Sequence, residues 1–181
     1  MPGITSNCET RITKALLELG LPISLLTNYH LPSYEECQDL VAIGPDMFGR
    51  EQQMDRTAAA QWSALRIAAK RAGVILSIVS AFRSLDHQKQ IIARKLASGQ
   101  SIEEILRVSA LPGFSEHHTG RAVDIGTPGN PPLTEAFEKT SAFAWLNQHA
   151  HEFHFHLSYP RNNTLGVIYE PWHWFFQKPH P

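Results

Sequence analysis

Two short stretches of the chain hold the residue types best suited to metal chemistry. The first places His117 and Asp124 on either side of Gly120, so the chain can turn back and aim both side chains inward. The second, near the C-terminus, adds the carboxylate of Glu170 and the imidazole of His173. Hydrolytic zinc is usually held by three side chains, with a fourth position open for water. The pattern therefore predicts one zinc ion held by two imidazoles and a carboxylate, with the spare carboxylate as its general base.

The position of Glu170 places a geometric demand on the backbone. It lies three residues before His173, close enough to share one site. In a regular strand, however, residues three apart face opposite sides. Pro171 interrupts a strand ladder, so we expect a kink or bulge there that turns both side chains inward.

Other histidines compete with this ligand set. His118 follows His117 directly, and an adjacent side chain usually points away from its neighbour. His154 and His156 share one face of a predicted strand, which is the spacing of a metal pair, but packing or pocket lining is the favoured interpretation. Trp172 is expected in the core or in the pocket wall.

The bulk composition fits one compact domain without nucleic-acid or membrane partners. The chain has 181 residues, 43% of them hydrophobic, and a formal net charge of -1. This charge offers no electrostatic argument for binding nucleic acid or an acidic membrane surface. The sequence contains no apolar stretch of membrane-spanning length and no secretory signal at its start. We therefore expect a cytoplasmic protein with Cys8 and Cys37 as reduced thiols, and the oligomeric state is left open.

Apolar spacing and capping residues predict several helices. The first predicted helix is capped by Thr10 and ended by Gly20, and the second covers residues 56–72 and is capped by Asp55. A third covers residues 86–98 and is capped near Asp86. A short helix is opened by a capping box at residues 101–104, and a last one covers residues 134–150.

The predicted strands lie mostly in the second half of the chain. They cover residues 74–80, 122–125, 153–157, 167–169 and 173–176. Residues 21–54 are punctuated by prolines and glycines and are expected to be irregular. Because helices come first and most strands late, the predicted class is α+β, with a small antiparallel sheet that carries the zinc site and packs against several helices.

Three ordered motifs resemble one enzyme family. Residues 115–124 match the S-x-H-x-x-G-x-A-x-D pattern of the VanY/LdcB-like D-alanyl-D-alanine and L,D-carboxypeptidases. Residues 170–173 match their E-P-W-H motif, and residues 80–84 resemble their S-x-[YF]-R-S motif. The resemblance covers residues 74–176 and implies a Hedgehog/DD-peptidase-like fold within a single domain, 1–181. Residues 1–50 carry no family motif and are expected to form an extension that wraps this core.

The resemblance also implies a role for each site residue. It makes His117, Asp124 and His173 the ligands of one Zn²⁺, Glu170 the catalytic base and proton shuttle, Arg83 a catalytic and substrate-binding residue near the scissile bond, and Gln88, Ser115 and Trp172 further substrate-binding residues. The chemistry agrees for Arg83, because a guanidinium suits a terminal carboxylate or a developing oxyanion.

Two positions depart from the family pattern. Ser158 stands before Tyr159-Pro160, where the family often has an arginine or a similar polar residue. Phe82 fills the aromatic position of the arginine motif without the hydroxyl of a tyrosine. We expect both departures to change substrate preference more than zinc chemistry.

The activity implied is removal of the terminal D-alanine from peptidoglycan stem peptides. The expected cytoplasmic location favours an L,D-carboxypeptidase that converts tetrapeptides to tripeptides during muropeptide recycling. A D,D-carboxypeptidase acting on pentapeptides is the first alternative, and a phage-type peptidoglycan endopeptidase is the next. A non-catalytic, zinc-stabilised binding module is a fourth, but such a module would have no need of both Glu170 and Arg83. The expected partner is a stem peptide or muropeptide.

Overall fold

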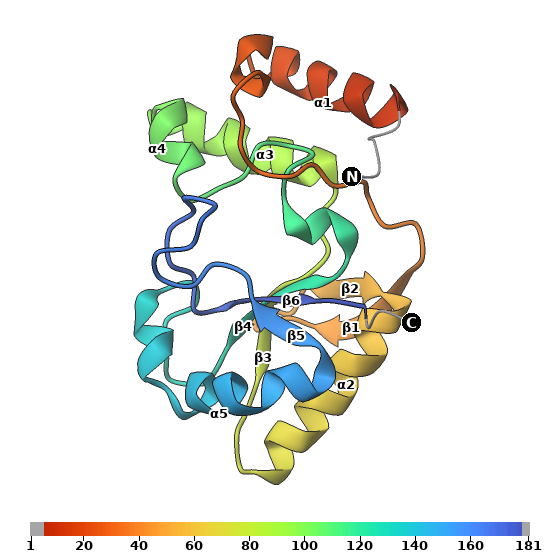
Figure 1. Cartoon of the computed structure of the whole chain (residues 1–181), viewed down its shortest axis with the longest axis vertical. Coiled ribbons are helices and arrows are strands. Elements are labelled where there is room, and N and C mark those ends of the chain that lie inside the picture. Colours follow the sequence, from red (N-terminus) through yellow and green to blue (C-terminus); the bar gives the residue numbers. More distant parts are fainter. Residues whose placement is uncertain (1–5, 179–181) are drawn as a thin grey trace.

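The computed structural model describes residues 6–178 and places two groups of helices on either side of a small sheet (Figure 1). One group holds α1 (Ser6–Glu18), α3 (Leu85–Ala97) and α4 (Ile102–Leu106). The other holds α2 (Arg56–Arg71) and α5 (Ser141–His149). This arrangement confirms the predicted α+β class. Residues 1–5 and 179–181, which the predicted single domain includes, lie outside the described part.

The strands form one sheet of four and one hairpin. The four-stranded antiparallel sheet has the order β3 (Ser77–Ser80), β4 (Ala122–Gly126), β6 (His173–Phe176) and β5 (Phe155–Leu157). The hairpin joins β1 (Leu40–Pro45) to β2 (Glu51–Asp55). Short 3-10 helices are η1 (Ile23–Leu26), η2 (Glu116–Thr119), η3 (Glu135–Lys139) and η4 (Ala150–Phe153). The two central strands, β4 and β6, are therefore the most enclosed positions of the sheet.

Alternation along the central strands separates the core from the site. Val123 and Ile125 of β4 and Trp174 and Phe176 of β6 enter the main hydrophobic core, together with residues of α2 and α5. Because side chains alternate along a strand, Asp124 and its neighbours on that face point to the opposite side. That side faces the group of helices formed by α1, α3 and α4.

The N-terminal segment packs on the helical group. Leu16 of α1 and Leu21 lie in a buried cluster with Ile92 of α3, Ile105 of α4 and Leu111. This packing supports the predicted wrapping of the core by residues 1–50, which stays a prediction. Within residues 6–178, no helix has the length and apolar character needed to cross a membrane.

Local signals in the sequence predicted several element ends correctly. Asp55 caps α2, because its carboxylate accepts hydrogen bonds from the backbone N–H groups of Thr57 and Ala58. Ser101 and Glu104 form the predicted capping box of α4. The predicted strands at residues 122–125 and 173–176 are β4 and β6.

Other element ends differ from the prediction. Thr10 lies inside α1, which has already begun at Ser6. Ser84, not Asp86, caps α3, because the Ser84 hydroxyl accepts the His87 N–H. The helix predicted for residues 134–150 is divided into η3 and α5 at Thr140, whose hydroxyl caps α5 by accepting from Phe143.

The largest error concerns residues 21–54, which are not irregular throughout. They contain β1 and the start of β2, and the turn between the two strands is built around Asp46. Its buried carboxylate accepts hydrogen bonds from Phe48, Arg50 and Gln52. Gly44, Pro45 and Gly49 belong to this turn and its approaches, whereas Pro22 precedes η1.

Other strand predictions are wrong, wholly or in part. Residues 167–169 form no strand, and residues 74–76 precede β3 without joining it. The Val167 carbonyl instead accepts from the side chain of Asn163, and the Glu170 N–H is donated to the Tyr159 carbonyl. The segment before β6 is therefore held by loop contacts rather than by a ladder.

Candidate metal centre

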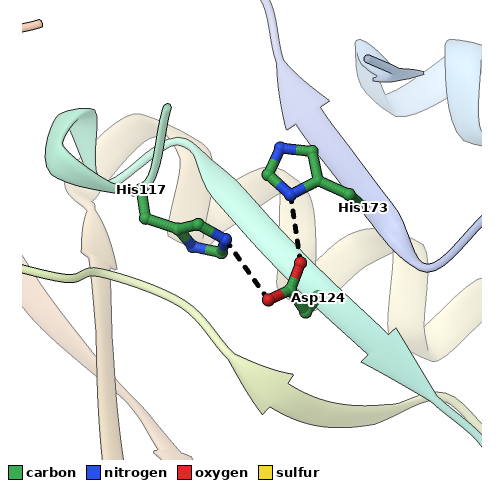
Figure 2. Close-up of side chains that lie close together, drawn as sticks. All are labelled: His117, Asp124 and His173. Carbon is green, nitrogen blue, oxygen red and sulfur yellow. Dashed lines mark hydrogen bonds and ion pairs between the residues drawn. The ribbon is translucent and has the colours of Figure 1, made fainter. Parts of the chain in front are cut away.

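The centre is built on a pair of residues that face each other across the two middle strands. Asp124 of β4 is the direct cross-strand partner of His173 of β6. The imidazole Nδ1 of His173 lies 3.0 Å from Asp124 Oδ1 (Figure 2). Antiparallel pairing thus brings together two residues that are 49 positions apart in the chain.

His117 reaches the same carboxylate from η2, just before β4. Gly120 ends η2 in the left-handed region, with φ of 66°. A Cβ added to Gly120 would lie 2.7 Å from the backbone nitrogen of Asp55, so both its conformation and its surroundings require glycine. The resulting turn sets His117 Nε2 at 3.3 Å from Asp124 Oδ2 (Figure 2).

The three side chains form a compact donor set. One donor atom from each of His117, Asp124 and His173 lies within 4.8 Å of the others, and all three residues are buried. His117 Nδ1 lies 2.6 Å from the Ala81 carbonyl oxygen, which makes Nδ1 the hydrogen donor and leaves the Nε2 lone pair facing the cluster. Two imidazoles and one carboxylate are a ligand set that suits zinc.

The Asp124 carboxylate and the proton on His173 form a buried pair of opposite charges, in which a metal cation can take the place of the proton. Burial alone would raise the pKa of Asp124, but the neighbouring His117 and His173 hold it well below its usual range. Burial opposes protonation of His173, whereas hydrogen bonds with Asp124 and Glu116 raise its pKa to about 10. The cluster therefore pairs a buried carboxylate with a positive charge, which a bound metal ion would supply in place of the proton.

Glu170 lies beside the cluster because the chain turns before β6 begins. The His173 N–H donates to the Glu170 carbonyl at 3.1 Å, so residues 170–173 form a turn rather than a strand. This turn at Pro171 meets the geometric demand seen in the sequence. Glu170 Oε2 lies 3.9 Å from His173 Nδ1, and burial, reinforced by the Asp124 charge, raises the pKa of Glu170 to about 7.

Arg83 approaches the cluster from the segment after β3. Its Nη2 lies 3.8 Å from Asp124 Oδ2 and 3.1 Å from the Ser80 hydroxyl, to which it donates. Its Nη1 donates to Gln88 Oε1 at 2.9 Å, and Gln88 Nε2 donates in turn to the Ala110 carbonyl. Gln88 is therefore buried behind Arg83 and positions it.

A cavity of about 400 Å³ opens in front of the cluster, between the sheet and the α3–α4 group. Its lining includes the three candidate ligands with Glu170 and Arg83. Ser115, Trp172, Tyr159 and Lys95 also line it, whereas Gln88 does not. The structure thus brings every predicted site residue except Gln88 to one hollow, which we call the metal cavity.

Glu116 is a member of this site that the sequence reasoning missed. It is only 8% exposed, and its Oε2 lies 2.8 Å from His173 Nε2. The same oxygen accepts a hydrogen bond from the Ser158 hydroxyl at 2.6 Å. These contacts fix the ring of His173 with Nδ1 toward Asp124. The available signal was the acid directly beside a candidate ligand, together with the unusual serine at position 158.

The competing histidines have other roles. The ring of His118 is fixed between the backbone of Arg83 and Gly113: Nδ1 lies 2.6 Å from the Arg83 carbonyl, and Nε2 accepts the Gly113 N–H. Burial lowers the pKa of His118 to about 4. His154 and His156 do not share a strand face as predicted, because His154 ends η4 in the left-handed region with φ of 61° and β5 begins after it.

The chain is similar to several known proteins. The family model VanY, described as D-alanyl-D-alanine carboxypeptidase, matches residues 51–179. The chain is 36% identical to the YodJ protein of Bacillus subtilis (strain 168) over 154 residues, which cover 80% of this chain and 55% of that protein. The chain thus spans about half the length of this relative.

Two solved structures show a similar fold. An LdcB LD-carboxypeptidase is 33% identical, with a TM-score of 0.71 over 80% of this chain and 71% of that one. A vancomycin-resistance D,D-pentapeptidase VanY, solved in complex with Zn(II), is 24% identical, with a TM-score of 0.57 over 83% of this chain and 80% of that one. At that identity the second likeness concerns the fold alone.

Proposed function

Because the chain belongs to the VanY family of D-alanyl-D-alanine carboxypeptidases, we propose that it is a zinc-dependent carboxypeptidase acting on peptidoglycan stem peptides. The observation that carries the proposal is the convergence of three candidate ligands with Glu170 and Arg83 on one cavity. The substrate is a stem peptide or muropeptide, and the product released is its terminal D-alanine.

Zinc is the cofactor proposed for this centre, one ion per chain. His117 Nε2, one oxygen of Asp124 and His173 Nδ1 would hold it, because these atoms face one another in a buried cluster. When bound, the cation lowers the pKa of a water molecule and polarises the carbonyl of the scissile bond. Glu116 and the Ala81 carbonyl hold the outer nitrogens of the two imidazoles and so orient both rings.

Glu170 is proposed as the general base. Its burial favours the neutral acid, so the carboxylate has a strong tendency to accept a proton from the attacking water. The same proton can then be donated to the nitrogen of the leaving D-alanine. A group that takes and returns one proton in this way needs a pKa near the working pH, which the burial of Glu170 provides.

Arg83 is proposed to bind the terminal carboxylate of the substrate or the oxyanion that forms on the scissile carbonyl. Two neutral partners, Ser80 and Gln88, already hold the guanidinium in place. Preorganised donors of this kind need little rearrangement during the reaction. Ser115 and Trp172 line the same cavity and are proposed to contact the substrate, whereas Gln88 acts through Arg83.

For the bond that is cut, we propose the L,D bond of a tetrapeptide, which leaves a tripeptide. Its support is the resemblance to an LdcB LD-carboxypeptidase at 33% identity over most of both chains. A cytoplasmic role in muropeptide recycling is part of this proposal. Cleavage of D-Ala-D-Ala in pentapeptides is the alternative, and the description of the family model favours it.

The test compares purified, zinc-loaded protein with its Glu170→Ala variant on matched tetrapeptide and pentapeptide substrates. We expect D-alanine release from the tetrapeptide, and a loss of about 10²- to 10⁴-fold in the variant at equal zinc content. Faster release from the pentapeptide would move the assignment to the D,D bond. Equal, negligible release by both proteins from both peptides would leave a zinc-stabilised binding module.

A further inference from the structure

A second cavity of about 480 Å³ lies directly beside the metal cavity. Arg83, Ile91 and Leu133 line both hollows, so the two meet along these side chains. Arg83 presents its guanidinium at this junction, with the Asp124 carboxylate 3.8 Å away on the side of the metal centre. A substrate held at Arg83 is therefore in reach of the second hollow.

The second hollow, which we call the arginine cavity, has a positive lining. Helix α3 presents His87, Ile91 and Arg94 to it, at a spacing that places them on one helical face. Arg50 and Arg83 line it from the hairpin and from the segment after β3. Three guanidiniums thus stand against a single lining carboxylate, that of Glu51.

Two of the cations differ in how they are held. The Nε of Arg50 donates to the buried Asp46 carboxylate at 2.7 Å, and its Nη2 donates to the Val79 carbonyl. Arg94 has no carboxylate partner among residues 6–178, and its Nε donates to the Gln90 carbonyl at 3.3 Å. The guanidinium of Arg94 is therefore the one in this cavity with its charge uncompensated.

The surroundings of His87 report the same positive potential. Burial lowers the pKa of His87, and the charges of Arg83, Arg94 and Arg50 lower it further. Three cations acting on one ring show that their fields overlap in the hollow. An anion placed there would gain from all three.

Part of the remaining lining is apolar. Phe48, Phe82 and Pro132 line the arginine cavity beside the cations. Phe82 stands where the family motif also allows tyrosine and offers no hydroxyl, and the Ser80 hydroxyl that lines the cavity accepts a hydrogen bond from Arg83. Apolar walls with a cationic end suit a short aliphatic group that carries a carboxylate.

We infer that the arginine cavity binds a second carboxylate of the peptide substrate, distinct from the group held by Arg83, with Arg94 as its principal partner. The inference rests on the proposed function, because it assigns a further part of the same substrate. A planar guanidinium forms paired hydrogen bonds with a carboxylate, which makes this group the best match among substrate parts. The contact would determine which peptides bind rather than how fast the bond is cut.

The test uses pairs of stem peptides that end in D-alanine. The two peptides of a pair differ only at one internal carboxylate, which is free in one and amidated in the other. Their binding is measured by calorimetry to the zinc-loaded Glu170→Ala protein, which is expected to turn them over about 10²- to 10⁴-fold more slowly. We expect amidation of one position to weaken binding about tenfold, the loss of one charge-assisted contact. When Arg94→Gln is added to the Glu170→Ala protein, binding of the free-acid peptide should weaken by the same factor. The acid and amide peptides should then bind equally.

Arg66→Gln is the matched control, because Arg66 is an exposed arginine of α2 that lines neither cavity. It should leave the difference between acid and amide intact. The inference is overturned if no amidation changes binding, or if the difference persists in the Arg94→Gln protein.

The outcome is separate from that of the proposed function. If the wild type releases no D-alanine but binding still differs between acid and amide peptides through Arg94, the subsite is supported and the carboxypeptidase activity is refuted. If D-alanine is released but binding does not differ between acid and amide peptides, the carboxypeptidase activity is supported and the subsite is refuted.

Discussion

Two hollows of this molecule can be compared directly: the metal cavity, and a groove of about 660 Å³ between β1 and α2. The groove is the larger, and Ile43, Trp62 and Ile67 line it with two exposed cations, Arg66 and Lys70. Its lining holds no histidine and no carboxylate, whereas the metal cavity concentrates two buried imidazoles, the buried carboxylate of Asp124 and the partly buried one of Glu170. The comparison shows that buried ionisable groups in contact, rather than volume, locate chemistry.

The two regions also place their acidic residues differently. At the metal centre, Asp124 and Glu116 are buried and Glu170 is partly buried beside imidazoles, which favours binding of a cation over stability of the metal-free site. At the ends of β1 and β2, outside the lining of the groove, Asp46 and Asp55 accept backbone hydrogen bonds and stabilise the turn and the helix start. We therefore expect substitutions in the first region to change chemistry, and those in the second to change stability.

The largest effect should follow from removing a candidate ligand. His117→Ala takes one of three donors from the cluster, so we expect loss of bound zinc and of D-alanine release together. Metal analysis after dialysis measures this directly, with His118→Ala as the neighbouring imidazole for comparison. Full zinc occupancy in the His117 variant would contradict the ligand assignment.

A smaller effect should follow at the carboxylate behind His173. Glu116→Gln keeps the shape of the side chain but weakens its hold on the Nε2 of that ring. We expect zinc affinity to fall by about 10- to 100-fold, as is usual for such outer contacts. Competition with a chelator measures the zinc affinity. An unchanged affinity would show that Glu116 contributes to packing and not to zinc binding.

The turn between β1 and β2 should respond in stability alone. Burial by itself would raise the pKa of Asp46, but hydrogen bonds from the backbone of Arg50 and Phe48 and from the Arg50 side chain lower it. A lowered pKa in the folded state gives stability that is present above the unfolded value and is lost as pH falls. Asp46→Asn should therefore cost about 2 kcal/mol of unfolding free energy at neutral pH, and less at pH near 3.

Urea unfolding at both pH values measures this change, while zinc content should stay at the wild-type level. A loss of zinc in the folded Asp46 variant would remove the distinction between the two regions.

The smallest effect is expected at the start of α2. Asp55→Ala removes the cap of that helix, so we expect a loss of about 1 kcal/mol in unfolding free energy. Thermal unfolding measures it, with zinc affinity and D-alanine release as the readouts that should not move. A change in either would show that the start of α2 is coupled to the metal cavity.

The same contrast explains what the sequence could predict. The cap at Asp55 and the capping box at Ser101 depend on residues three or fewer positions away, so their signals are local. His117 and Asp124 could be picked out because the turn at Gly120 leaves a short, recognisable spacing between them, and His173 because it stands in the E-P-W-H motif.

What the sequence could not reveal depends on distant contacts. Glu116 meets Ser158 and His173 across 42 and 57 positions, and no local pattern marks such an encounter. The hairpin of β1 and β2 was hidden for a related reason. Its turn is organised by one carboxylate, Asp46, among glycines and prolines that also occur in irregular chain.

The central claim is that one cation is held where the two imidazoles meet Asp124. A crystal structure of the zinc-loaded protein, with anomalous difference density measured at the zinc absorption edge, tests it most directly. The account predicts a single strong peak at about 2.0–2.2 Å from His117 Nε2, an Asp124 oxygen and His173 Nδ1. A peak elsewhere, or none in crystals of protein saturated with zinc, would contradict it.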